Sequence, residues 1–140
     1  MAEKTSGSPV TALAEIVLWT RDLDRSLAFY RDLFELTVIS PPDLANRFLS
    51  AGMGPGGVPM MIVLVPHPEG RAVVFSPEKK RRVLHHLAFS VAADRYDDLE
   101  KRCRAHGLEV RGGRHPVLER VRTFYVDDPD GNEVEVIAPE

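Results

Sequence analysis

The chain contains the same order of expected elements twice, and this internal repeat constrains the fold more than any other feature. Residues 14–20 are rich in β-branched and aromatic side chains, which is typical of a strand, and the helical spacing of apolar residues over 21–34 predicts a helix. Three further strands are expected at 35–40, 46–52 and 58–66. The second half repeats this order, with a strand at 85–91, a helix at 92–107 and strands at 108–113, 122–128 and 132–139.

The spacing between the two halves can be counted. Glu15 and His86 stand at matching positions in the first strand of each half, 71 residues apart. Leu64 lies 49 residues after Glu15, and Glu135 lies 49 residues after His86. The equal spacing predicts that Leu64 and Glu135 occupy equivalent positions in the last strand of each half.

The repeat predicts an α+β fold in which two tandem βαβββ modules form a curved eight-stranded cup with the helices outside. Each module has one apolar sheet face against its helix and a second face left to be filled or used. We expect a flexible tail at residues 1–11 and a single domain at 12–138. Its modules lie at about 12–66 and 84–138, joined by a linker at about 67–83.

Composition excludes several classes of protein. A formal net charge of −3 argues against a nucleic-acid partner. No apolar run is long enough to span a bilayer, and the polar N-terminus lacks the apolar core of a secretion signal, so no membrane partner is expected. Cys103 is the only cysteine, which excludes an intrachain disulfide and fits a reducing cytoplasm. We therefore expect a cytoplasmic protein.

Alternation along the strands selects the side chains that face the cup. If Glu15 points inward, Trp19 does too, and by the repeat His86 and Glu135 point inward with them. His85, next to His86, is expected to face the other way. Glu15, His86 and Glu135 would then converge from the first and last strands of the modules, while Leu64 fills the fourth symmetric position.

One imidazole and two carboxylates suit a divalent cation such as Mn²⁺, Fe²⁺, Zn²⁺, Co²⁺ or Ni²⁺. Three protein ligands leave coordination positions open for water and a substrate oxygen, which suits catalysis. The turn "DPDGN" at 128–132 would fix the register of the strand that carries Glu135. The plainer alternative is that His86 is a hydrogen-bonded core histidine and that Glu15 is a solvated residue at a strand end.

Other side chains are candidates for substrate binding. Trp19 and Phe48 can line an apolar pocket. Tyr125 can donate a proton, and Arg122 can hold a carboxylate or a phosphate.

Three segments carry a resemblance to a known family: "DLDRSLAFYRDLFEL", "HHLAFSV" and "DPDGNEVEV". With them the chain resembles the vicinal oxygen chelate superfamily over residues 12–138. That superfamily includes glyoxalase I, methylmalonyl-CoA epimerase, fosfomycin-resistance enzymes, extradiol dioxygenases and bleomycin-resistance proteins. The resemblance implies one divalent metal ion held by Glu15, His86 and Glu135. The family more often has histidine at the position of Glu15 and an acid or glutamine at that of Leu64.

The resemblance implies a metal-dependent enzyme of the glyoxalase-like type, a lyase, isomerase, epimerase or transferase, acting on a small oxygenated substrate. Glu15 or Glu135 would also transfer the proton. An alternative is a metal-free protein of the bleomycin-resistance type, which sequesters its ligand between aromatic side chains. An extradiol-type dioxygenase is less favoured, because that branch uses two histidines and one carboxylate. The resemblance also implies a homodimer, and the open strand edges of a cup favour such pairing.

Overall fold

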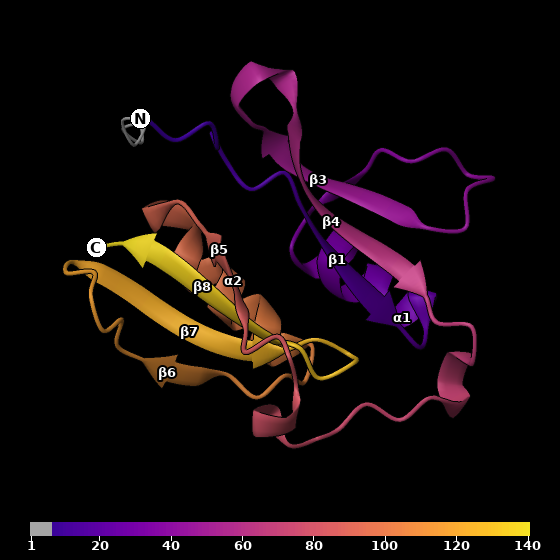
Figure 1. The fold of residues 1–140 in the computed structure, drawn as a ribbon. Helices are drawn as coiled ribbons and strands as arrows, with labels where there is room; N and C mark the ends of the chain where they lie inside the picture. The colour runs from indigo at the N-terminus through magenta and orange to yellow at the C-terminus, as the bar shows by residue number, and fades with distance from the viewer. Residues whose placement is uncertain (1–6) are drawn as a thin grey trace.

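The computed structural model describes residues 7–140, so part of the expected tail at 1–11 lies outside the described residues. The chain forms two modules with the same order of elements, each with its own sheet (Figure 1). The α+β class and the tandem βαβββ organisation expected from the repeat are confirmed.

In the first module the strands lie in the order β1-β4-β3-β2, with β1 parallel to β4 and the other pairs antiparallel. The elements are β1 (Glu15–Thr20), α1 (Leu23–Leu27), the π-helical turn η1 (Ala28–Leu33), β2 (Thr37–Val38), β3 (Arg47–Met53), η2 (Pro55–Gly57) and β4 (Pro59–Pro66). The connection to the second module contains two short 3₁₀ turns, η3 (Gly70–Ala72) and η4 (Lys79–Arg81).

The second module repeats this topology in the order β5-β8-β7-β6, again with one parallel pair, β5 and β8. Its elements are β5 (Leu87–Ser90), η5 (Ala93–Arg95), α2 (Tyr96–Ala105), β6 (Arg111–Gly113), β7 (Val121–Asp127) and β8 (Glu133–Pro139). The eight strands therefore form two four-stranded sheets, in which β1 and β5 are edge strands.

Local chemistry accounts for the ends of the helices. The Asp22 side chain accepts a hydrogen bond from the Arg25 backbone amide at 3.3 Å and caps α1. Gly107 has φ of +77° directly after α2, a left-handed conformation that favours glycine and ends the helix where expected. The second strand is shorter than the expected 35–40, and it cannot begin at Glu35, because that residue adopts a positive φ of +60°.

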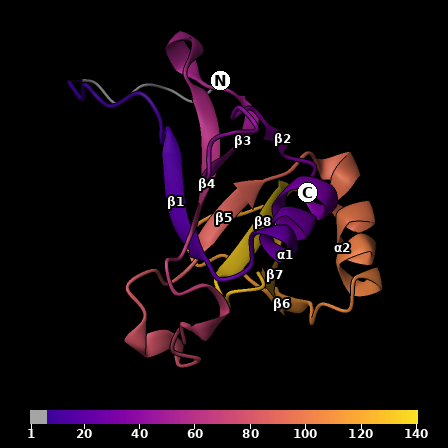
Figure 2. The same ribbon diagram turned by 90° about the vertical axis from the view of Figure 1, so that its right-hand side faces the viewer.

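The helices α1 and α2 lie beside each other on one side of the sheets (Figure 2), and the Arg102 side chain donates to the backbone carbonyl of Asp32 at 2.9 Å. One hydrophobic core includes residues from both helices and from the helix-facing sides of both sheets. Tyr30, Leu33, Phe124 and Cys103 are among its most buried members. Among the described helices, none combines the length and apolar character needed to cross a bilayer.

The turn between β7 and β8 is closed by the carboxylate of Asp128. One of its oxygens accepts hydrogen bonds from the backbone amides of Asp130 at 2.9 Å and Asn132 at 2.8 Å. The other accepts from the Asn132 side chain at 2.9 Å. Gly131 takes a φ of +83°, which a glycine adopts without strain. The "DPDGN" sequence thus produces a turn with a defined geometry.

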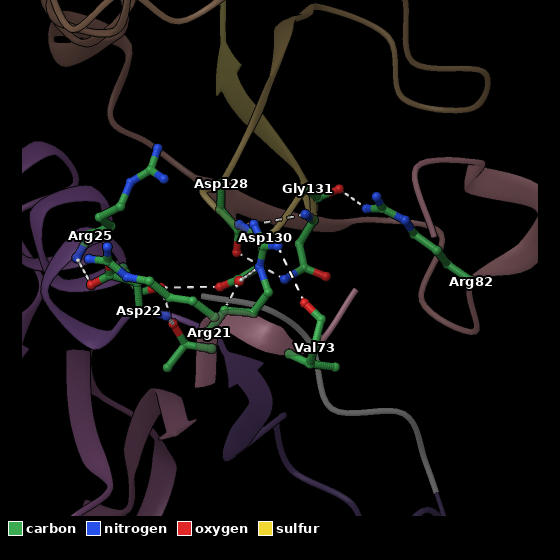
Figure 3. Close-up of polar contacts among 12 residues, drawn as sticks. Arg21, Asp22, Arg25, Val73, Arg82, Asp128, Asp130 and Gly131 are labelled. Atoms are coloured by element: carbon green, nitrogen blue, oxygen red, sulfur yellow. Dashed lines mark hydrogen bonds and ion pairs between the residues drawn. The ribbon is translucent and has the colours of Figure 1, made fainter. Parts of the chain in front are cut away.

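The same turn connects the two modules (Figure 3). The hydroxyl of Tyr30, in η1, donates to Asp128 at 2.6 Å. Asp130 accepts from the backbone amide of Arg21 at 3.1 Å, from its guanidinium at 3.3 Å and from the Ser26 hydroxyl at 3.3 Å. Burial raises the pKa of Tyr30 well above its usual value, so the phenol keeps its proton and remains a donor.

We predict that Tyr30→Phe destabilises the protein by about 1–3 kcal/mol, because a buried carboxylate loses a hydrogen-bond donor. Urea denaturation at neutral pH measures the change. Tyr96→Phe is the matched control, since Tyr96 is also buried but its hydroxyl bonds to no described residue. An equal decrease in the free energy of unfolding in the two variants would contradict the role assigned to the Tyr30 hydroxyl.

Candidate metal-binding site

Glu135 lies in the middle of β8 with its carboxylate buried and fully engaged. The residue is 2% exposed. One oxygen accepts hydrogen bonds from the hydroxyls of Thr123 at 2.7 Å and Tyr125 at 3.0 Å, both from β7. The other oxygen lies 3.0 Å from Nε2 of His86. The sheet therefore holds this carboxylate in one orientation and aims its second oxygen at an imidazole.

His86 stands just before β5 and is contacted on both ring nitrogens. Its Nδ1 lies 2.7 Å from Nδ1 of His85. The expectation that His85 faces the other way is wrong, because strand alternation begins only at Leu87, where β5 starts. In the irregular backbone before that residue, two adjacent histidines present their rings to each other.

Glu133, two residues before Glu135, carries two cationic partners. Its oxygens pair with Lys79 from the connection and with Arg111 from β6, the latter at 3.2 Å. Burial opposes ionisation, but these ion pairs lower the pKa of Glu133 below its usual value. Donor atoms of His85, His86 and Glu133 all lie within 4.8 Å of one another, which makes this end of the sheet a cluster of metal-ligating side chains.

Glu15 does not join this cluster within the described chain. It stands at the start of β1 with an exposed side chain, and it makes no hydrogen bond to any residue of 7–140. Trp19 lies on the same face of β1 and is 52% exposed. Phe48 pairs in register with Val63 of β4, which in turn pairs with Val17 of β1. Trp19 and Phe48 thus share the open face of the first sheet, apart from His86 and Glu135.

The assignment of Leu64 as the counterpart of Glu135 is wrong. Leu64 pairs with Leu18 and lies in the core, whereas Glu135 pairs with Ala88 on the open face. Since Ala88 matches Val17 by the repeat, Val63 is the residue equivalent to Glu135. The two halves differ in length by one residue before the last strand, and a slip of one residue moves a side chain to the opposite face.

Arg122 and Tyr125 lie on opposite faces of β7. Tyr125 pairs with Glu135 and shares its face. The Arg122 guanidinium lies 4.2 Å from the centre of the Tyr96 ring and 2.7 Å from Asp97, both in α2. The structure therefore places Arg122 on the helix side of the sheet, away from His86 and Glu135.

The donor atoms of His86 and Glu135 fit a divalent cation. Two neighbouring donor atoms that each lie about 2.1 Å from one metal ion in octahedral coordination are about 3.0 Å apart. The observed separation of Nε2 and the carboxylate oxygen is 3.0 Å. A nitrogen and an oxygen donor together suit Mn²⁺, Fe²⁺, Co²⁺, Ni²⁺ or Zn²⁺.

Comparison with known proteins identifies the family. Residues 12–136 match the model of the Glyoxalase/Bleomycin resistance protein/Dioxygenase superfamily. The chain belongs to this superfamily.

Solved structures share the fold over 94% or more of this chain. A glyoxalase/dioxygenase from Nostoc punctiforme has a TM-score of 0.73 at 19% identity, covering 100% of this chain and 99% of that one. The fosfomycin resistance protein FosX from Listeria monocytogenes has a TM-score of 0.67 at 23% identity, covering 94% of each. Lactoylglutathione lyase from Agrobacterium tumefaciens has a TM-score of 0.64 at 26% identity, covering 94% and 96%. A variant of FosX has been crystallised with Mn(II) and dihydroxypropylphosphonic acid.

A comparison with curated proteins found no match.

Sequence reasoning missed Thr123, which donates to Glu135, and Lys79, which pairs with the nearby Glu133. Thr123 lies two residues before Tyr125 on the same strand, so alternation alone would have found it. Lys79 comes from the connection between the modules, where no periodic pattern indicates which side chain reaches the sheet.

The charge on Glu135 should be measurable through Tyr125. Burial raises the pKa of Tyr125, and the adjacent Glu135 carboxylate raises it further. We predict that Glu135→Gln lowers the pKa of Tyr125 in metal-free protein, because a negative charge beside the phenol is removed. A pH titration of isotope-labelled tyrosine, followed by NMR, measures the pKa of Tyr125 in each protein.

Glu133→Gln is the control for this titration, because Glu133 is the smallest of the causes that raise the pKa of Tyr125. It should lower that pKa by less than Glu135→Gln does. If Tyr125 titrates identically in wild type and Glu135→Gln, the contact between the phenol and the carboxylate is not formed in solution.

Proposed function

We propose that this chain is a metal-dependent enzyme of the glyoxalase-like type, a lyase, isomerase, epimerase or related transferase acting on a small oxygenated substrate. The observation that carries the proposal is the pair formed by His86 and Glu135, whose donor atoms lie 3.0 Å apart. A buried carboxylate is costly in an apolar core unless its charge is compensated. Two hydroxyl donors direct the Glu135 carboxylate toward the imidazole, where a bound cation would compensate the charge.

His86, Glu135 and Glu15 would hold the metal, which when bound acts as a Lewis acid that polarises a substrate oxygen. His85 supports this assignment through its contact with Nδ1 of His86. When His86 donates its Nδ1 proton to His85, its Nε2 carries a lone pair. Nε2 and the Glu135 oxygen are then two acceptors 3.0 Å apart, a pair that a cation stabilises.

The two carboxylates differ in how free they are to move a proton. Both oxygens of Glu135 are engaged, by Thr123 and Tyr125 on one side and His86 on the other. Glu15 is exposed and makes no hydrogen bond to the described residues. We therefore assign proton transfer to Glu15 and the fixed ligand position to Glu135, while Tyr125 keeps its proton and orients that carboxylate.

A second copy of the chain would bring Glu15 to the site. The open face of the first sheet carries exposed apolar side chains, Val17 and Trp19 at 53% and 52%, and β1 and β5 are unpaired sheet edges. Apolar surface and open edges both favour association. We propose a homodimer in which the first sheet of one copy lies against the second sheet of the other.

Relatives support the choice of reaction class. FosX and lactoylglutathione lyase carry the same fold, and a FosX variant binds Mn(II) with a small phosphonic acid. The single histidine among the proposed ligands favours glyoxalase-like chemistry over oxygen-dependent ring cleavage.

Metal content tests the proposal. Protein purified without an affinity tag and incubated with Mn²⁺, Ni²⁺ or Zn²⁺ should retain about one ion per chain. His86→Ala and Glu135→Gln should each weaken metal binding by more than about 100-fold, because each removes a ligand. Elemental mass spectrometry and calorimetry measure these changes.

His106→Ala is the matched control, because His106 lies at the end of α2 and bonds to the Arg102 carbonyl. It should bind metal as wild type does. If the wild type takes up none of the three metals, the enzyme proposal fails and a metal-free ligand-binding protein of the bleomycin-resistance type replaces it.

Mixing two variants tests whether the site is shared between copies. Glu15→Ala and His86→Ala should each bind metal weakly. After the two are unfolded together and refolded, half of the dimers are mixed, and one of the two sites in each has every ligand. We expect about a quarter of the wild-type metal content to return.

Sedimentation of the same samples confirms that they are dimers. A site built within one chain gives a different result, because every chain in the mixture lacks a ligand and no tight metal binding returns. That outcome, with dimers present, would contradict the shared site.

A further inference from the structure

The phenol of Tyr125, on β7, lies against both of the proposed metal ligands that the second module provides. Its hydroxyl donates to the Glu135 carboxylate on β8 at 3.0 Å. Its ring meets the His86 imidazole edge-on, with ring centres 6.0 Å apart and an angle of 78° between the two planes. The position of this one ring therefore affects the orientation of two ligands.

The same ring occupies the space that a side chain at Gly113, the last residue of β6, would need. A Cβ atom on Gly113 would lie 2.5 Å from Cε2 of Tyr125, and 3.4 and 3.5 Å from Cδ2 and Cζ. Carbon atoms that are not bonded to each other prefer a separation of about 3.5–4.0 Å. The Tyr125 ring can therefore lie where it does only because residue 113 has no side chain.

The neighbouring Gly112 differs in this respect. A Cβ atom on Gly112 would meet no atom within 4 Å outside its chain neighbours. Gly113 pairs with Thr123 and Gly112 with Phe124, so the two glycines face opposite sides of the sheet. Neither glycine has a positive φ, the conformation that favours glycine. The constraint at Gly113 is therefore the space taken by the ring, and Gly112 has no such constraint.

The backbone at Gly113 is held in place more firmly than the ring. β6 lies at the edge of the second sheet, beside β7 (Figure 1). Arg111, at its start, pairs with Asp127 at 2.7 Å and with Glu133 at 3.2 Å. The Tyr125 ring, in contrast, turns about two side-chain bonds. A side chain at residue 113 would therefore displace the ring and leave the paired backbone in place.

We propose that Gly113 is a positioning residue for the pair formed by His86 and Glu135. The missing side chain lets the Tyr125 hydroxyl reach Glu135 while the ring edge meets His86. The inference rests on the proposed function in one respect, since that function makes the pair metal ligands. Groups that orient metal ligands typically change metal affinity by about 10–100-fold when they are lost.

Gly113→Ala tests the proposal, and Gly112→Ala is the matched control on the same strand. Gly113→Ala should weaken the binding of Mn²⁺ or Zn²⁺ by about tenfold, as Tyr125→Ala should, whereas Gly112→Ala should bind metal as wild type does. In a Tyr125→Ala background, which has no ring to displace, Gly113→Ala should cause no further loss. Calorimetry measures the affinities.

NMR of metal-free protein follows the ring directly. The chain contains three tyrosines, so labelled tyrosine resolves the signals of Tyr125. In wild type we expect nuclear Overhauser contacts from the Tyr125 ring to the Hα protons of Gly113 and to the His86 ring. The contact with His86 should persist in Gly112→Ala and be lost in Gly113→Ala. Thermal unfolding checks that both variants fold, as expected for alanine at a φ that alanine can adopt.

The two measurements distinguish this inference from the proposed function. If Gly113→Ala binds metal as tightly as wild type, or if its contact between Tyr125 and His86 survives, the role of Gly113 is overturned while the metal site stands. Equal losses in Gly112→Ala and Gly113→Ala would also overturn it. If wild type binds no metal, the proposed function fails, and the contacts in metal-free protein alone support or overturn the positioning of the ring.

Discussion

The rest of the structure depends on the hydrogen bonds that the carboxylates of Asp128 and Asp130 accept. Asp128 closes the turn before β8 through two backbone amides and accepts the Tyr30 hydroxyl from the other module. Asp130 binds Arg21 and Ser26. A turn with so many fixed donors sets the register of β8. A slip of one residue there would send Glu135 into the core and expose Val134 or Val136.

The internal repeat predicted the order and type of the elements. It is visible in the periodic spacing of apolar residues, and those residues are the ones that pack into the core. The caps at Asp22 and Gly107 were predictable because each follows from one local interaction or one backbone conformation. The first residue of β2 was not predictable, since Glu35 takes a left-handed conformation that its side chain does not indicate. Where a strand ends depends on where its hydrogen bonds to the neighbouring strand stop. That neighbouring strand can lie far away in the sequence.

The candidate site was also predicted only in part from the local sequence. The sequence predicted that His86 and Glu135 lie close together, and their side chains are in contact, although His86 stands one residue before β5. Alternation along the strands failed for His85, which precedes the strand, and for Leu64, where one extra residue reverses the face. Counting residues from Glu15 could not place it relative to His86 either, since that depends on how two sheets, or two copies of the chain, are arranged.

One turn connects the interface between the modules, the segment that joins them and the strand that carries Glu135. Asp130 holds the first helix, the carbonyl of Gly131 holds Arg82, and Glu133 at the start of β8 holds Lys79 from the same connection. The position of the connection is therefore fixed by the same turn that aims Glu135. Because Asp128, Asp130 and Gly131 belong to one turn, a change in that turn would alter the contact between the modules and the orientation of the Glu135 carboxylate together.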